Sequence, residues 1–194
     1  MLTHNEKKIL KFLFSSFADQ SINHIAKSCN ITPNGTLKIL KKLEKEGILK
    51  RKEIGKLHSY YLDFNNEKTT AILNIALREE FIERVKYRFD DLSPLRDLTD
   101  AAIIFGSYLD IKKEPNDLDI LFIIKPDKFK EYKKASLRVF QAIPTKVHDV
   151  LQTEEDLKNN LIKHDKVIFE ILRTGIIFWG HEKLIEIVKN EYKR

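Results

Sequence analysis

Cysteine, tryptophan and methionine each occur once in this sequence of 194 residues, and glycine occurs only six times. The single cysteine, Cys29, cannot form an internal disulfide, so we expect it to be a small buried apolar side chain. The six histidines have no spacing that is typical of a zinc site. The fold must therefore be stabilised without an internal disulfide, and no structural zinc site is predicted.

Long apolar runs are also absent. No stretch approaches the roughly 18 consecutive apolar residues that a membrane-spanning helix requires, and charged residues stand near the N-terminus, where a signal peptide has its apolar core. A hydrophobic content of 42% with 33% charged residues is typical of a globular protein and excludes a disordered or collagen-like chain. These features predict a cytoplasmic protein with no membrane partner.

The positive charge is unevenly distributed along the chain. The formal net charge is +6, and residues 1–66 hold 12 Lys and Arg against 6 Asp and Glu, whereas residues 67–194 hold 23 of each kind. This asymmetry is expected if the first third of the chain meets a polyanion and the remainder does not. A lysine-rich solvated surface is the alternative explanation.

The first third predicts three helices followed by a hairpin. The helix starts are marked by capping residues: Thr3 with Glu6, Ser21, and Thr32 with Pro33. Gly47 ends the third helix, and 48–53 and 57–64 read as two strands joined by a turn.

This order of elements, with the stretch ITPNGTLKILKKLEKEGILKRKEIGKLHSYYL, resembles the winged helix-turn-helix domain of many bacterial and archaeal transcription regulators. The resemblance covers roughly residues 1–65 and implies DNA as a partner. On a helical wheel the third helix has an inward stripe of Thr36, Leu40 and Leu43. A second stripe could enter a major groove while the wing meets phosphates; the DNA-binding candidates are Asn34, Lys38, Lys41, Lys45, Arg51, Lys52 and Lys56. Winged helices also serve as protein-interaction modules, which is the alternative.

The rest of the chain mixes helices and strands. Residues 67–92 are expected to form a long amphipathic helix that links two domains or serves as a dimer surface. Strands are predicted at 101–105, 118–124, 146–151 and 176–179, and helices at 127–143, at 153–174 and from 182 onward.

Asp117 and Asp119 stand two residues apart at the start of an apolar strand. Alternation along a strand places both carboxylates on one face, about 7 Å apart, where they repel each other unless a cation bridges them. Such oxygen ligands suit Mg²⁺ or Mn²⁺ held together with a substrate phosphate. Gly106 and Ser107, at the end of the preceding strand, supply a close backbone approach and hydrogen-bond donors for that phosphate. Asp149, on a separate strand, is the candidate third carboxylate.

In this part of the chain an apolar run is followed by Gly-Ser, by nine further residues, by Asp-x-Asp and later by an isolated Asp. This order of motifs resembles the nucleotidyltransferase superfamily related to DNA polymerase beta. The resemblance covers roughly residues 93–180. It implies an α/β fold with a short mixed sheet, a nucleoside triphosphate (NTP) as donor, and two divalent ions. In that scheme Gly106 and Ser107 grip the triphosphate, and Asp117 and Asp119 hold both metals. Asp149 binds the catalytic metal and helps to deprotonate the acceptor. Alternation along the strand makes the neighbouring His148 point the other way.

The sequence departs from this family at one place. Minimal members often have an arginine soon after Gly-Ser, and this chain has none there; Lys112 or Lys113 could supply the cation from further along the loop.

The combined prediction is an α+β protein with a winged helix-turn-helix domain at 1–66, a linking helix at 67–92 and a nucleotidyltransferase-like domain at 93–194. Its predicted activity moves a nucleoside monophosphate from an NTP to a hydroxyl acceptor by a two-metal mechanism, coupled to DNA binding. The alternative is a transcriptional regulator or antitoxin whose transferase-like domain only senses nucleotide or binds a toxin partner. A homodimer is expected, because it would present two recognition helices to a two-fold site.

Overall fold

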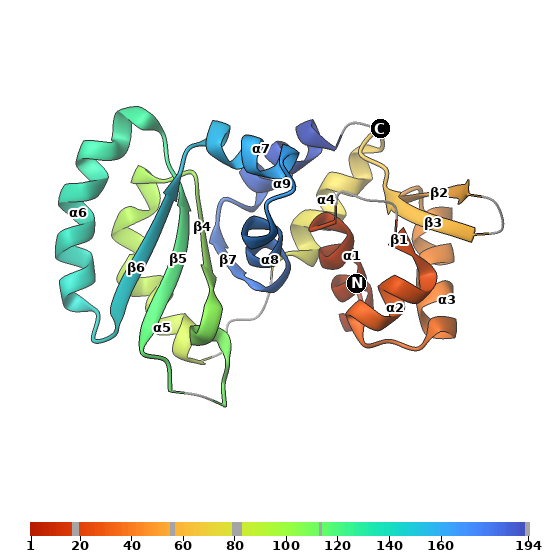
Figure 1. Ribbon diagram of the computed structural model, residues 1–194, viewed down its shortest axis with the longest axis horizontal. Coiled ribbons are helices and arrows are strands. Elements are labelled where there is room, and N and C mark those ends of the chain that lie inside the picture. The colour runs from red at the N-terminus through yellow and green to blue at the C-terminus, as the bar shows by residue number, and fades with distance from the viewer. Residues whose placement is uncertain (17–19, 55–56, 79–82, 113, 193–194) are drawn as a thin grey trace. The chain divides into compact units, whose positions relative to one another are not determined.

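The computed structural model describes residues 1–16, 20–54, 57–78, 83–112 and 114–192 (Figure 1). By its internal contacts the chain divides into two compact units. Unit 1 comprises Met1–Arg78 together with Tyr192, and unit 2 comprises Glu79–Glu191. The division therefore falls inside the segment for which the sequence predicted one linking helix.

Unit 1 begins with three helices, α1 (His4–Phe14), α2 (Ile22–Cys29) and α3 (Pro33–Lys45). Each starts where the sequence predicted, because Thr3, Ser21 and Thr32 all accept a hydrogen bond from a backbone amide of the first turn. The helices bury a shared set of apolar side chains, which includes Ile9, Leu13, Ile25, Leu40 and Leu43. The predicted helical part of the winged helix is confirmed.

A three-stranded sheet accompanies these helices. The predicted hairpin is formed by β2 (Leu49–Ile54) and β3 (Leu57–Leu62). A two-residue strand that the sequence did not predict, β1 (Gln20–Ser21), pairs antiparallel with β3 and gives the order β1-β3-β2. Helix α4 (Glu67–Ala76) packs against α1 and completes unit 1.

The single helix predicted over 67–92 is two helices in the structure. α4 ends at Ala76, with Leu77 as its C-cap, and α5 (Glu83–Leu92) begins in unit 2. Both helices are amphipathic and no proline or glycine separates them, so their apolar periodicity reads as continuous in the sequence. Phe81 and Ile82, two apolar residues of the segment 67–92, lie outside the described residues.

Unit 2 is built on a four-stranded mixed sheet in the order β6-β5-β4-β7. Its strands lie where the sequence predicted them: β4 (Ala101–Phe105), β5 (Asp117–Ile123), β6 (Lys146–Gln152) and β7 (Ile176–Trp179). β4 is antiparallel to β5 and β7, whereas β6 is parallel to β5. A parallel pair needs a crossover, which α6 (Phe129–Ala142) supplies. The prediction of a mixed sheet is confirmed.

Helices cover both faces of this sheet (Figure 1). α5, the 3-10 helix η1 (Ser93–Leu98) and α6 pack on the face that carries Ile104, Ile120 and Phe122. The other side holds α7 (Glu154–Ile162), α8 (Lys166–Thr174) and α9 (His181–Glu191).

The helix predicted over 153–174 is also broken into two, α7 and α8. His164 between them adopts a left-handed conformation with φ of 53°, and Asp165 caps the start of α8. A chain reversal at a non-glycine residue has no strong marker in the sequence, which explains the error.

Cys29 is buried, as predicted, and its burial raises the pKa of the thiol to about 11. None of the helices in the described ranges combines the length and the apolar character needed to cross a bilayer.

Candidate functional site

Helix α3 of unit 1 has an apolar and a basic face. Thr36, Leu40 and Leu43 are buried, as predicted. The predicted stripe is exposed along its length: Asn34, Lys38, Lys41 and Lys45. No carboxylate in the described part of the chain forms an ion pair with these three lysines. Exposed ammonium groups along one side of a helix are suited to DNA phosphates and base edges.

The wing contributes further positive charge. Arg51 and Lys52 of β2 are exposed, whereas Lys56 lies outside the described residues. The guanidinium of Arg51 already has carboxylate neighbours: its Nε is 3.5 Å from Oε1 of Glu44, and its Nη2 is 3.6 Å from Oε1 of Glu53. Arg51 would have to exchange these pairings to contact a phosphate, so the stripe on α3 is the stronger candidate for a DNA interface.

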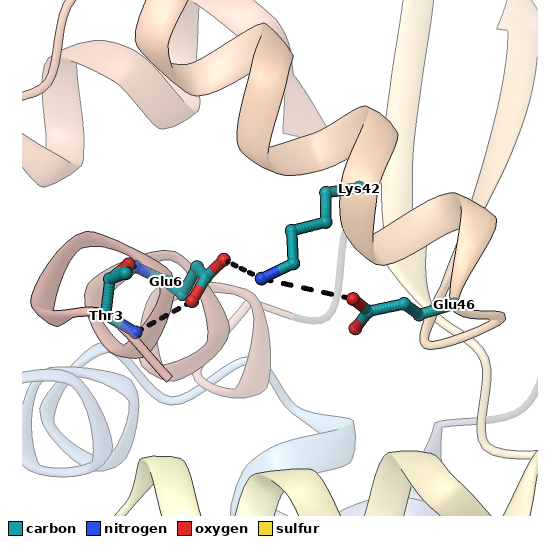
Figure 2. Close-up of polar contacts among 4 residues, drawn as sticks. All are labelled: Thr3, Glu6, Lys42 and Glu46. Carbon is teal, nitrogen blue, oxygen red and sulfur yellow. Dashed lines mark hydrogen bonds and ion pairs between the residues drawn. The ribbon is translucent and has the colours of Figure 1, made fainter. Parts of the chain in front are cut away.

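An ion pair inside unit 1 holds α3 against α1 (Figure 2). Nζ of Lys42 donates to Oε1 of Glu6 at 2.7 Å, and Oε2 of Glu6 accepts from the backbone amide of Thr3 at 2.7 Å. The Glu6 side chain is only 4% exposed. Burial acts to raise the pKa of Glu6, but the hydrogen bonds from Lys42 and Thr3 outweigh it and lower the pKa below its ordinary value. Glu6 therefore stays ionised and anchors α3.

In unit 2, three potential metal ligands meet at the start of β5. Asp117 and Asp119 project from one face of the strand, as their spacing predicted, and His148 of β6 joins them. One ligand atom from each residue lies within 4.8 Å of the other two. Nδ1 of His148 is 3.3 Å from Oδ2 of Asp117 and 3.5 Å from Oδ1 of Asp119. Two carboxylates and an imidazole at this spacing fit a divalent cation.

Asp149 lies apart from this cluster. Its carboxylate accepts a hydrogen bond from the hydroxyl of Tyr132 on α6 at 3.0 Å, and Nζ of Lys133 is 3.6 Å away. In the strand register Asp149 is opposite Ile120, on the face that packs on α6, whereas His148 is opposite Asp119. The structure thus reverses the positions expected for Asp149 and His148. Burial, together with the neighbouring Asp149, raises the pKa of Tyr132, so the phenol remains a donor.

Gly106 and Ser107 form the corner between β4 and the 3-10 helix η2 (Gly106–Leu109). Gly106 has a φ of +78°, and a Cβ added there would lie 2.5 Å from Oδ2 of Asp119. Glycine is therefore required both for the backbone conformation and for the close approach to Asp119. Gly106 and Ser107 are exposed, which leaves their backbone accessible to a ligand beside the carboxylates. Of the two candidate loop cations, Lys112 is exposed and Lys113 lies outside the described residues.

A cavity of about 630 Å³ opens beside this corner. Its walls come from the end of β4 and from η2 on one side, and from α8 on the other; they include Phe105, Gly106, Leu109, Lys166, Val167 and Glu170. The volume lies in the range of small-molecule sites. Because Gly106 borders both the cavity and Asp119, the cavity and the three-ligand cluster adjoin.

The substitution Gly106→Ala tests the close approach to Asp119. A methyl group at positive φ costs about 1 kcal/mol of unfolding free energy, and it would also displace the carboxylate of Asp119. We expect a correspondingly small loss of stability in urea unfolding and, if Asp119 holds a divalent ion, weaker Mn²⁺ binding by calorimetry.

Gly47→Ala in unit 1 is the matched control for this substitution. Gly47 has a φ of +74°, and its added Cβ would meet another flexible side-chain end, Nδ2 of Asn66, at 2.6 Å. This variant should lose similar stability and leave the Mn²⁺ titration unchanged. Equal Mn²⁺ affinity in Gly106→Ala and Gly47→Ala would contradict the proposed role of Gly106.

Comparison with known proteins bears on unit 1. A family model described as winged helix-turn-helix DNA-binding matches residues 2–50. No curated protein sequence matches the chain. The crystal structure of a zinc-responsive MarR family member, ZitR of Lactococcus lactis, is 22% identical over 50% of this chain and 76% of that chain, with a TM-score of 0.30. A structural similarity of this size supports no inference about the present chain.

The matched residues include α1, α2 and α3 with their capping residues and the exposed basic stripe. The chain therefore carries a winged helix-turn-helix DNA-binding domain in its first third.

Proposed function

We propose that this protein is a DNA-binding transcription regulator whose unit 2 binds an effector at Asp117 and Asp119. The observation that carries the proposal is the exposed stripe of Lys38, Lys41 and Lys45 on α3, within residues that match a DNA-binding family. In this domain class the corresponding helix enters the major groove and the wing lies near phosphates. The excess of positive charge in the first third of the chain concentrates the attraction to DNA there.

Salt dependence tests the DNA-binding half of the proposal. The full chain is titrated with duplex DNA from upstream of its own coding region and followed by fluorescence anisotropy, from about 50 to 300 mM KCl. If the stripe and wing meet about five phosphates, the log–log slope of affinity against salt is about −4 to −5. A scrambled duplex of equal length serves as the control for sequence preference. Absence of binding at the lowest salt, or binding that salt does not change, would overturn the proposal.

For unit 2 we propose a metal-bound nucleotide as the effector. Asp117 and Asp119 would hold a divalent ion, and Gly106 with Ser107 would contact the phosphates. The adjoining cavity has room for the nucleoside. Mg²⁺ or Mn²⁺ would supply the positive charge between carboxylates and phosphates. Calorimetry with ATP and Mg²⁺ should show joint binding that Asp117→Asn and Asp119→Asn weaken.

The pair of carboxylates beside Gly106 also favours a second function, nucleotidyl transfer. In that reaction an acceptor hydroxyl forms a bond to the α-phosphorus, the bond to pyrophosphate breaks, and the hydroxyl proton passes to a base. Asp149 accepts a hydrogen bond from Tyr132 and lies outside the cluster, so the cluster has two carboxylates where the resemblance implies three. This difference is the reason why regulation is preferred over catalysis.

Incubation with α-labelled ATP, GTP, CTP and UTP plus Mg²⁺ separates the two functions. Label transfer to an acceptor with pyrophosphate release, lost in Asp119→Asn, would establish catalysis. Nucleotide binding without pyrophosphate release would leave unit 2 as an effector domain. The homodimer and the toxin partner remain predictions; a dimer would present its two α3 helices about 34 Å apart to a two-fold operator.

A further inference from the structure

His148 stands where β5 and β6 bring it against the aspartate pair. The two strands are parallel, and their register places His148 opposite Asp119 and Lys146 opposite Asp117. Residues paired in this way share a face of the sheet, so both side chains of β6 border the carboxylates. Only the imidazole of His148 reaches them, since no ion pair joins Lys146 to a carboxylate within the described ranges.

The distances between ligand atoms in this cluster are close to those between neighbouring ligands of one metal ion. Ligand atoms at about 2.1 Å from an octahedral ion are about 3 Å from their nearest neighbours. Nδ1 of His148 is 3.3 Å from one carboxylate oxygen and 3.5 Å from the other. Small side-chain rotations would therefore place all three around one ion. The side chains of Asp117, Asp119 and His148 are 32%, 27% and 44% exposed, which leaves one side of that ion open to water or phosphate.

A cavity borders Gly106, the residue that lies against Asp119, and is a second observation beside the cluster itself. The cavity of about 630 Å³ is bordered by Gly106, and Gly106 in turn lies against the carboxylate of Asp119. A chance cluster of surface charges needs neither a glycine at positive φ nor a cavity beside it. Gly106 thus lies between the three-ligand cluster and a space of ligand size.

We propose that His148 is the third protein ligand of this site and that it makes the site prefer Mn²⁺ over Mg²⁺. Mg²⁺ is held almost entirely by oxygen ligands, whereas first-row transition-metal ions accept an imidazole nitrogen. The inference rests on the proposed binding of a divalent ion at Asp117 and Asp119, and it adds the metal preference and the residue that sets it.

The test compares Mn²⁺ and Mg²⁺ in the full chain by calorimetry at one fixed pH, with electron spin-echo spectroscopy of bound Mn²⁺. In the unsubstituted protein we expect Mn²⁺ to bind at least about 10-fold more tightly than Mg²⁺, with a nitrogen signal from a bound imidazole. His148→Ala should weaken Mn²⁺ binding about 10-fold or more, remove that signal and change Mg²⁺ affinity little. His148→Asp, which restores an all-oxygen set, should shift the preference toward Mg²⁺.

Lys146→Ala is the matched control, because it removes an exposed cation from the same face of β6. If His148 acted only as a positive charge between the aspartates, His148→Ala would raise the affinity for both ions alike. That result, or an Mn²⁺ complex without the nitrogen signal, overturns the role of His148 while the aspartate site stands. If neither ion binds, or if Asp119→Asn binds both ions unchanged, the proposed metal site itself fails.

Discussion

Replacing Lys38, Lys41 and Lys45 together by alanine is expected to weaken DNA binding about 100-fold or more at low salt. These ammonium groups are exposed on one side of α3, and no described carboxylate pairs with them. Each contact to a phosphate releases bound counterions, so losing three contacts should reduce the magnitude of the log–log salt slope by about 3. Anisotropy titrations at several salt concentrations measure both quantities.

A triple substitution in unit 2 controls for net charge. Lys130, Lys134 and Arg138 are exposed along α6, and replacing them by alanine removes the same three charges from a helix outside the winged helix. This variant should retain nearly all of the affinity and the salt slope. If both triple variants lose affinity equally, binding depends on overall charge, and α3 is not the recognition element.

Glu6→Gln is expected to lower the unfolding free energy of unit 1 by about 1–2 kcal/mol, because a charged hydrogen bond in a nearly buried site is replaced by a neutral one. The glutamine side chain can still accept a hydrogen bond from the amide of Thr3, so the helix cap persists. The loss of stability therefore measures the interaction with Lys42. Hydrogen exchange of α1 and α3 amides in the full chain measures this stability without interference from unit 2.

The same carboxylate predicts a pH dependence. The pKa of Glu6 is lowered in the folded protein, so its contribution is fully present above its ordinary value of 4.5 and is lost as the pH falls through the folded pKa. The hydrogen bond to Glu6 raises the pKa of Lys42 above its ordinary value of 10.5, so the contribution of Lys42 is fully present below 10.5 and is lost as the pH rises through the folded pKa. Glu6→Gln should flatten the acid limb of the stability curve.

Glu46→Gln is the control for this prediction. Glu46 is the second carboxylate near Lys42, at 3.9 Å, and its side chain is 44% exposed (Figure 2). An exposed pair at this distance contributes little, so this substitution should change stability by less than about 0.5 kcal/mol. Equal losses from Glu6→Gln and Glu46→Gln would show that burial of Glu6 is not the cause.

The first three helices of unit 1 could be predicted because the start of each is marked by local chemistry. Capping side chains at Thr3, Ser21 and Thr32 mark the three helix starts, and they act within one turn of the chain. The strand β1 was missed because two residues are too few to show a periodicity, and their pairing with β3 is a long-range contact.

Only the part of the candidate site that lies on a single strand could be predicted from the sequence. Alternation along β5 is a local property, so the shared face of Asp117 and Asp119 follows from the sequence. The place of His148 depends on the register between β5 and β6, which a crossover helix separates in the chain. Asp149 does share a face with its apolar neighbours on β6, but the sequence does not reveal that Tyr132 meets it there.

Strand β2 lies at the edge of the sheet that unit 1 forms in the described residues, and it carries three cations in succession, Lys50, Arg51 and Lys52. An unpaired strand edge is a template on which a second copy of the same chain can add its own strand and begin to aggregate. Lys50 and Arg51 have carboxylate partners in their own chain, but long charged side chains along an edge still hinder the addition of such a strand. These three cations therefore protect against aggregation even when no DNA is bound. Neutralising them should reduce solubility as well as the affinity for DNA.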